Sequence, residues 1–233
     1  MKQKFTVLFD LDGTLVDTAP DLMRAHNHVM QKFGYPTKST EEIRNLVGKG
    51  AGAMIGRSIW GQAKKEFGKV NDEKVKKEMV TEFVDFYGKN IINESTLING
   101  VKEFLNWCKN QNISMAVCTN KQEHLSNDLL KKIGIYDYFE YVAGSDTFDY
   151  CKPDPRHLTS VVEILDGDIK KSIMIGDSET DSDAARNAGI RRSTIFGSAG
   201  VRSTQSDSGP ESRVLHYRRS GGFASGSRRT RAL

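Results

Sequence analysis

The stretch Phe5-Thr6-Val7-Leu8-Phe9-Asp10-Leu11-Asp12-Gly13-Thr14 decides the fold class of this chain. Its first five residues form an apolar run rich in branched and aromatic side chains, which predicts a strand buried in a parallel sheet. Asp10 and Asp12 follow, and burying two carboxylates is unfavourable unless a cation or a proton accompanies them. The N–H groups of a turn at Gly13 can also face a phosphate. The stretch therefore predicts an acidic, metal-ready and anion-receiving pocket at the carboxyl edge of a sheet, although an isolated Asp-x-Asp-Gly also occurs as an ordinary turn.

From residue 99 onward the sequence alternates predicted helices and strands. Apolar strands are expected over residues 113–118 and 172–175, with a short strand over 138–143. Two prolines make residues 151–155 a predicted rigid, extended loop. The alternation predicts an α/β fold with a doubly wound parallel sheet, in which a site lies outside the carboxyl ends of the strands. The helices between the strands are predicted over residues 101–111, 125–133, 157–165 and 183–188.

Residues 18–90 are expected to form an inserted block of helices, an α-helical cap domain. Its first helix begins near Ala19 and ends at Gly34, and a second begins at Ser39. After a glycine-rich segment at residues 46–55, two more helices are predicted at about 59–67 and 72–90. The prediction divides the chain into an α/β core domain, made of residues 1–17 and 91–190, and the cap.

The glycine-rich segment contains Gly48-Lys49-Gly50, for which two interpretations stay open. In the first, this is a flexible turn between helices and Lys49 is solvated. In the second, the cap loop reaches over the site, and Lys49 and the loop amides face an anionic substrate. Arg57 is a second cationic candidate, although an arginine on a helix is more often solvated.

The composition is that of a globular protein, with 37% hydrophobic and 27% charged residues. No stretch approaches the ~20 apolar residues of a membrane span. Cys108, Cys118 and Cys151 show neither zinc spacing nor a disulfide framework, which favours a reducing, cytoplasmic setting. The net charge of +4 is uneven: nine arginines and two acidic residues lie in 191–233, so the preceding residues carry −3. The main body therefore lacks the broad basic footprint of a nucleic-acid-binding protein.

Residues 191–233 differ from the rest of the chain in composition. They are rich in Ser, Gly and Arg, whereas every lysine precedes residue 191. We expect this atypical tail to be disordered and to be an out-of-frame or assembly-derived sequence that replaces a last strand and helix. The alternative is a basic, disordered tail that binds nucleic acid or other anionic partners.

Four segments of the chain together resemble the motifs of the haloacid dehalogenase-like hydrolase superfamily, over about residues 5–190. Taken alone, Thr119 can cap a helix or a turn, Lys152 can be a surface lysine, and Asp177 and Asp181 can be a helix-capping pair. Each, however, follows a strand or lies in the loop that a strand feeds, which favours convergence at one site. The segments are Asp10-Leu11-Asp12-Gly13-Thr14-Leu15, Thr119-Asn120, Lys152-Pro153 and Gly176-Asp177-Ser178-Glu179-Thr180-Asp181.

The resemblance implies a catalytic role for each motif residue. It makes Asp10 the nucleophile that attacks phosphorus and forms an aspartyl-phosphate. It makes Asp12 the general acid for the departing alcohol and the general base for water. Thr119 and Asn120 are expected to bind the substrate, with Thr119 hydrogen-bonded to the phosphoryl oxygens, and Lys152 to neutralise the charge of nucleophile and phosphate.

A Mg²⁺ cofactor is implied as well. Asp10, Asp177 and the backbone carbonyl of Asp12 are the expected ligands, and Asp181 is expected to support the site. An oxygen-rich ligand set suits this ion, and a carboxylate that attacks a phosphate dianion needs charge neutralisation. Lys49 completes the predicted substrate-binding set.

The acid at position 12 favours a phosphatase over a dehalogenase, because the departing oxygen needs a proton. Among capped members, residues 46–50 and 176–181 look most like phosphoglycolate phosphatases, so we expect a phosphoric monoester hydrolase that acts on a small phosphorylated metabolite, 2-phosphoglycolate in the first place. The alternatives are a β-phosphoglucomutase, another sugar or nucleotide phosphatase, and a catalytically crippled binder with a basic tail, because cap loops select the substrate. No membrane partner is expected, and nucleic acid only through the tail.

Overall fold

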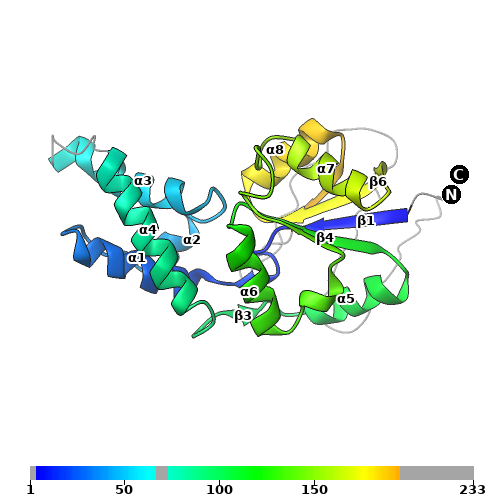
Figure 1. Cartoon of the computed structure of the whole chain (residues 1–233), viewed down its shortest axis with the longest axis horizontal. Helices are drawn as coiled ribbons and strands as arrows, with labels where there is room; N and C mark the ends of the chain where they lie inside the picture. The colour runs from blue at the N-terminus through cyan, green and yellow to red at the C-terminus, as the bar shows by residue number, and fades with distance from the viewer. Residues whose placement is uncertain (1–3, 67–72, 195–233) are drawn as a thin grey trace, which may run out of the picture. The chain divides into compact units, whose positions relative to one another are not determined.

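The computed structural model describes residues 4–66 and 73–194, and its central element is a five-stranded parallel sheet (Figure 1). The strand order is β5-β4-β1-β6-β7, so the first strand lies in the middle. In the register, Phe9 of β1 lies opposite Val117 of β4 and Ile175 of β6, which brings the carboxyl ends of the three strands level. The strands are β1 (Lys4–Phe9), β4 (Ser114–Cys118), β5 (Tyr141–Ala143), β6 (Gly167–Gly176) and β7 (Arg191–Thr194).

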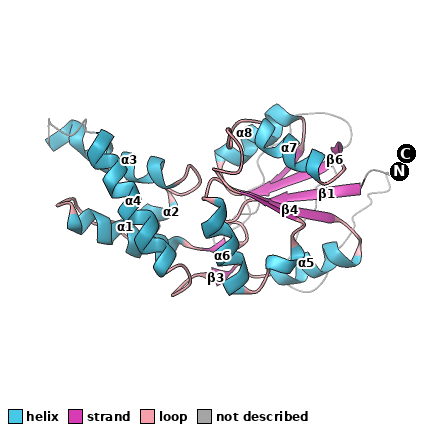
Figure 2. Cartoon of the chain, in the orientation of Figure 1, coloured by secondary structure: helices cyan, strands magenta, loops and turns pink. Residues whose placement is uncertain are grey.

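Helices cover both faces of the sheet, as expected for a doubly wound fold (Figure 2). Alternation along β1 explains why both faces are apolar: Val7 and Phe9 belong to one buried cluster, and Leu8 to the other. On the first face, the Phe9 ring meets the rings of Phe104 and Phe139 edge-on at 6.0 and 5.8 Å between centroids. The helices are α5 (Val101–Asn110) and α6 (Glu123–Ile133) on that face, and α7 (Arg156–Ile164) and α8 (Glu179–Ala188) on the other.

A block of helices is inserted between β1 and α5. The second helix begins with a capping box, in which the Ser39 hydroxyl accepts from the Glu42 N–H and the Glu42 carboxylate accepts from the Ser39 N–H. Two short strands, β2 (Val16–Asp17) and β3 (Thr96–Leu97), pair antiparallel where the chain enters and leaves the block. The helices are α1 (Ala19–Lys32), α2 (Thr40–Arg44), α3 (Ala51–Glu66) and α4 (Glu73–Lys89).

The two connections to the block are fastened by a buried carboxylate on α1. Asp21 accepts hydrogen bonds from the Glu94 N–H at 3.0 Å, the Ser95 N–H at 2.9 Å and the Ser95 hydroxyl at 2.7 Å. A carboxylate with several such donors is stabilised although it is buried. The block therefore begins and ends at one fixed point beside the sheet.

Several sequence predictions need correction. Helix α8 begins at Glu179 rather than at residue 183, so Asp181 lies in its first turn. Strands β5 and β6 also begin at other residues than expected, at Tyr141 and Gly167. Helix α3 begins at Ala51 rather than near residue 59, so the glycines at its start were mistaken for a longer loop. Residues 151–155 form a turn rather than an extended loop, because the Asp154 N–H donates to the Cys151 carbonyl at 2.9 Å. Residues 191–194 form β7, which pairs with β6, so the sheet does have a strand where its loss was predicted. The predictions for residues 195–233 lie outside the described residues, and the predicted domain boundaries stay predictions.

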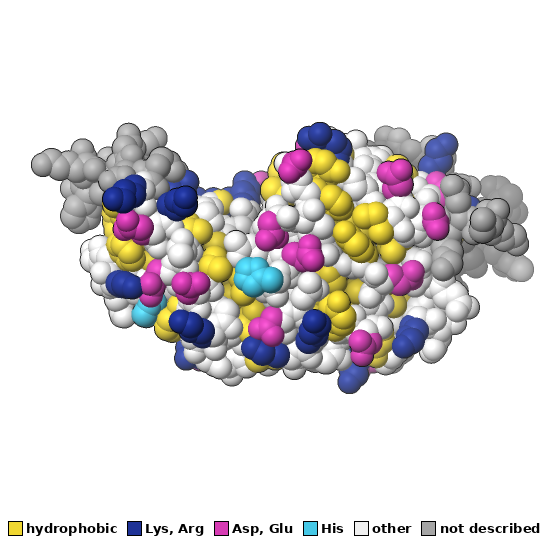
Figure 3. Space-filling view, viewed as in Figure 1, with side chains coloured by type: hydrophobic (Ala, Val, Ile, Leu, Met, Phe, Trp, Pro, Cys, Tyr) yellow, Lys and Arg dark blue, Asp and Glu magenta, His cyan; other side chains and the backbone are white. Residues whose placement is uncertain are grey.

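The surface of the described residues shows mixed charge. On the face drawn in Figure 3, lysine and arginine side chains are interspersed with aspartate and glutamate, and no single sign dominates. No helix in the described ranges has both the length and the apolar character needed to cross a membrane. Single exposed apolar side chains such as Phe5 and Ile164 are ordinary for a protein surface.

Candidate active site

Three carboxylates meet at the carboxyl edge of the sheet. Asp10 follows β1, and Asp177 and Asp181 follow the neighbouring strand β6. Each offers an oxygen within 4.8 Å of the others, which is close enough for one ion to bind them together. Gly13, at φ +80°, makes this approach possible because a Cβ there would overlap the Asp177 carboxylate. The sequence prediction that these residues converge is matched by their positions.

Lys152 supplies the positive charge inside this cluster. Its ammonium lies 3.0 Å from Asp10 Oδ1 and 2.5 Å from Asp181 Oδ1, and its side chain is only 1% exposed. Burial alone would lower the pKa of Lys152, but the charges of Asp10 and Asp181 outweigh burial and raise it. The lysine therefore stays charged and holds the two carboxylates in place.

One lysine does not balance three carboxylates. Burial, and then the charge of Asp181, raise the pKa of Asp10 to about 7, although Lys152 acts against the shift. Asp177 is the exposed member, and partial desolvation and Asp181 still raise its pKa to about 6. Such shifts mark a site that is short of positive charge. A hard divalent cation with oxygen ligands fits this donor set.

Asp12 has a different environment from Asp10. Its Oδ1 accepts from the Thr18 hydroxyl at 2.7 Å, and both of its oxygens accept from the Lys121 ammonium at 2.9 Å. Among the described residues, the group of carboxylates that can share an ion includes Asp10 but not the side chain of Asp12. Only the backbone carbonyl of Asp12 was predicted as a ligand, and that prediction stays untested.

Sequence reasoning missed Lys121 and its contact with the cap. The Lys121 side chain is 5% exposed, and its ammonium lies 4.4 Å from the centre of the Tyr87 ring on α4. The sequence position of Lys121 could have indicated a place in the site, because Lys121 directly follows Thr119-Asn120 at the end of β4. No such signal marked Tyr87, which looked like any aromatic residue on the buried side of a long helix.

Thr119 and Asn120 occupy the carboxyl end of β4, as predicted. Thr119 is 2% exposed, and its hydroxyl accepts from the Lys121 N–H at 3.2 Å. Thr119 therefore also stabilises the turn after β4, which is the structural role that the sequence left open. The Asn120 amide donates to the Gly48 carbonyl at 3.1 Å and to the Lys152 carbonyl at 3.0 Å. Asn120 thus joins the cap loop to the loop that carries Lys152.

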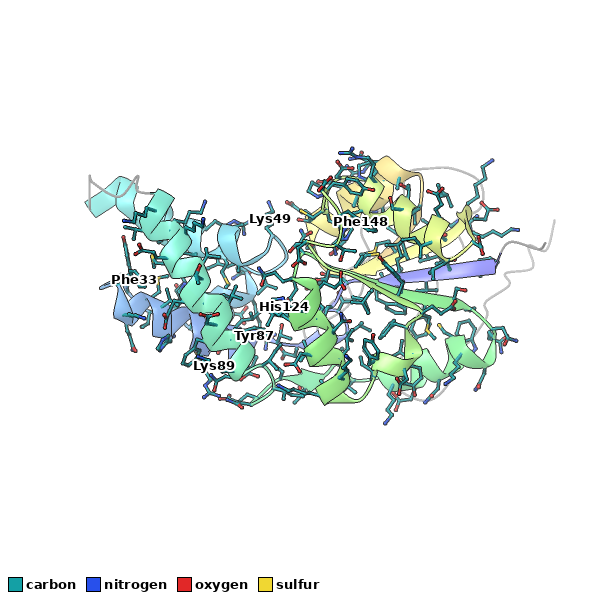
Figure 4. The ribbon with its side chains drawn as sticks, in the orientation of Figure 1. Phe33, Lys49, Tyr87, Lys89, His124 and Phe148 are labelled. Atoms are coloured by element: carbon teal, nitrogen blue, oxygen red, sulfur yellow. The ribbon has the colours of Figure 1, made fainter. Side chains whose placement is uncertain are left out.

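A cavity of about 520 Å³ lies over these residues. From the sheet side it is lined by Asp10, Asp12, Thr119, Asn120, Lys121 and Lys152, and from the cap by residues 47–54 and by Phe83 and Tyr87. Figure 4 labels Lys49 on the loop before α3, where its side chain is exposed and lines the cavity. Arg57, the second cationic candidate, is not among the described residues that line the cavity. Its guanidinium donates to the Leu46 carbonyl at 3.5 Å. The cap therefore supplies the loop of Lys49 and one face of α4 to the cavity.

Comparison with known proteins agrees with this geometry. The family model described as "Haloacid dehalogenase-like hydrolase" matches residues 7–195. The chain is 39% identical over 185 residues to a phosphoglycolate phosphatase of Caulobacter vibrioides, covering 79% of this chain and 76% of the relative. It is 38% identical over 184 residues to a phosphoglycolate phosphatase of Mesorhizobium japonicum, covering 79% of each.

Solved structures give the same picture. The crystal structure of a predicted phosphoglycolate phosphatase from Haemophilus somnus superposes with a TM-score of 0.76 at 30% identity, covering 84% of this chain and 88% of that one. A β-phosphoglucomutase from Clostridium difficile shares the fold with a TM-score of 0.68 at 23% identity, covering 81% and 83%. With its strand order, its acidic sheet edge and its match over residues 7–195, this chain belongs to the haloacid dehalogenase-like hydrolase family.

Proposed function

We propose that this chain is a Mg²⁺-dependent phosphatase that hydrolyses a small phosphorylated metabolite, with 2-phosphoglycolate as its substrate. The observation that carries the proposal is the buried Asp10 carboxylate, which faces the cavity in contact with Lys152 and beside Asp177 and Asp181. Two relatives of known name, both phosphoglycolate phosphatases, support this choice of substrate. Catalysis then needs a nucleophile, a proton donor and charge neutralisation, and each has a candidate.

Asp10 is the nucleophile in this proposal. Its carboxylate attacks phosphorus, the bond to the leaving oxygen breaks, and an aspartyl-phosphate forms. Lys152, 3.0 Å from Asp10 Oδ1, lowers the repulsion between the carboxylate and the phosphate dianion. Asp12 gives a proton to the leaving oxygen and later takes one from the attacking water. Lys121 and Thr18 fix the orientation of Asp12 by their hydrogen bonds.

The residues that would hold Mg²⁺ are Asp10, Asp177 and the Asp12 backbone, with Asp181 in support. When bound, the ion supplies charge neutralisation for the phosphoryl group and the carboxylates. The pKa values of Asp10 and Asp177 are raised, which is the direction expected for carboxylates that a bound cation would stabilise. Asp181 is held by the Lys152 ammonium and by the Ser178 N–H and hydroxyl, which suits a supporting role.

The remaining residues of the site bind the substrate in this proposal. Thr119 is buried at the end of β4 and lines the cavity, so its hydroxyl is available to the phosphoryl oxygens. Asn120 also lines the cavity beside Thr119, and its amide keeps the cap loop against the core through the Gly48 carbonyl. Lys49 has no acidic partner among the described residues and faces the cavity, as a residue that attracts an anion would.

Release of phosphate from 2-phosphoglycolate tests the proposal. The purified full chain should release phosphate in the presence of Mg²⁺ and not in excess EDTA. Asp10→Asn should abolish turnover, because an amide is not a nucleophile for phosphorus. Asp128→Asn, which removes an exposed carboxylate from a surface ion pair on α6, is the matched control and should keep wild-type activity.

Two results would contradict the proposal. Full activity in Asp10→Asn would exclude the covalent mechanism. Activity toward phosphorylated sugars that exceeds activity toward 2-phosphoglycolate would keep the phosphatase and change its substrate.

A further inference from the structure

The cavity contains a buried hydroxyl group whose proton has no acceptor among the described residues. Tyr87 on α4 is 1% exposed, and its hydroxyl makes no hydrogen bond of standard geometry with any described residue. The Lys121 ammonium lies 4.4 Å from the centre of the Tyr87 ring, and an ammonium has only donors. A hydrogen bond from Lys121 to the phenol oxygen would therefore still leave the phenolic proton without an acceptor. A buried polar group without a partner is unfavourable, so its presence in a cavity points to a ligand.

Two unlike donors thus meet at one place in the cavity. Tyr87 comes from the cap and Lys121 from the loop after β4, and both line the cavity (Figure 4 labels Tyr87). A charged N–H donor beside a phenolic O–H donor is a pair that recognises an anionic oxygen. Burial strengthens such an interaction, because the local dielectric constant is low. The ammonium already has both oxygens of Asp12 as partners, so the pair is preorganised rather than mobile.

The position of the pair limits the size of the ligand. Lys121 lies 2.9 Å from Asp12, which the proposed function places within about 3 Å of the leaving oxygen. The ammonium is therefore no more than about 6 Å from that oxygen, two hydrogen-bond lengths in line. A group that meets the pair must stand on the first carbon atoms after the phosphate ester.

We propose that Tyr87 and Lys121 form a subsite for a carboxylate next to the phosphate ester, and so select small phosphorylated carboxylates over phosphate esters with an uncharged group at that position. The inference rests on the proposed function and deepens it. It makes Tyr87 a residue of the cap that determines specificity. A substrate contacts Tyr87 only when α4 lies over the loop after β4. It separates this role from that of Lys49, which stands on a different segment of the cap.

Two esters of matched size test the subsite. Ethyl phosphate has a methyl group where 2-phosphoglycolate has a carboxylate, so the ratio of the two kcat/KM values isolates recognition of that group. In Tyr87→Phe, which removes only the hydroxyl, this ratio should fall about tenfold or more, as expected for one hydrogen bond to a charged group. In Lys121→Met it should fall further, because the charge is lost. Tyr138→Phe removes a hydroxyl that is bonded to Asn106 away from the cavity, and should leave the ratio unchanged.

Stability separates recognition from a structural role. Removing an unpaired buried hydroxyl should leave the melting temperature of the free enzyme equal to or above that of the wild type. A lower melting temperature in Tyr87→Phe, together with an unchanged ratio, would show that the hydroxyl is structural and would overturn the inference.

Other outcomes distinguish the inference from the proposed function. A ratio that collapses in Lys49→Met but not in Tyr87→Phe would place the carboxylate at the cap loop and overturn the inference alone. Equal use of both esters by the wild type would also overturn it, and would leave the phosphatase standing. No hydrolysis of either ester by the wild type would overturn the proposed function, and the inference with it.

Discussion

Replacing Asp10 by asparagine should make the metal-free protein more stable. The pKa of Asp10 rises from 3.8 to about 7 because the carboxylate is buried, and then because Asp181 is close. Since the pKa is higher in the folded state, stability falls as the pH rises from about 4 to 7. A shift of about 3 units corresponds to about 4 kcal/mol at pH 8 and about 2 kcal/mol at pH 5. Asparagine keeps the shape of the side chain and removes this charge, while Lys152 keeps Asp181 as its partner.

Urea unfolding in EDTA measures the effect. The free energy of unfolding of Asp10→Asn should exceed that of the wild type by up to about 4 kcal/mol at pH 8, and the difference should shrink by half or more at pH 5. Asp128→Asn, on an exposed surface pair, should show no such gain at either pH. If Asp10→Asn is no more stable than the wild type at pH 8, burial does not make the Asp10 charge unfavourable, and the argument for a site short of positive charge fails. Added Mg²⁺ should stabilise the wild type more than the variant, because the variant lacks one proposed ligand.

Two further predictions concern other residues. Gly13→Ala places a Cβ at φ +80° against the Asp177 carboxylate. The free energy of unfolding should fall by about 1–3 kcal/mol, and the Mg²⁺ concentration needed for half-maximal phosphate release should rise. An unchanged metal requirement would contradict this. His157 is buried, and desolvation followed by the charge of Lys152 lowers its pKa to about 4, so the unfolded chain takes up the proton first when the pH falls below about 6.5. Relative to His157→Leu, the wild type should therefore lose about 2 kcal/mol of stability between pH 7 and pH 5 in urea unfolding, and a difference that does not vary with pH would exclude this.

The parts of the site that could be predicted are those that each follow a strand. Asp10, Thr119 and Asp177 come directly after apolar strands, and parallel strands end at one edge, so their meeting follows from topology. The same reasoning predicted the place of Lys152, because Lys152 lies in the loop that follows β5. Their catalytic and metal-binding roles remain predictions, because position alone does not show chemistry.

The parts that could not be predicted depend on packing between distant segments. The contact of Lys121 with Tyr87 requires α4 to lie over the loop after β4, and no local pattern records such a contact. Strand β7 was missed because Arg191-Arg192-Ser193-Thr194 has no apolar pattern; as an edge strand it pairs through its backbone and leaves both arginines exposed. The start of α3 was missed because glycines at a helix start resemble a loop.

The central place of β1 has a consequence for synthesis on the ribosome. Strand β1 needs β4 on one side and β6 on the other, and these lie more than about 100 and 150 residues later in the chain. At ~5–20 residues per second, the first partner follows after roughly 5–20 s. During that interval the apolar strand has neither neighbour, and an unpaired strand edge is prone to aggregation. Asp10 is thus translated long before the rest of the proposed site, which is complete only after α8 has been made.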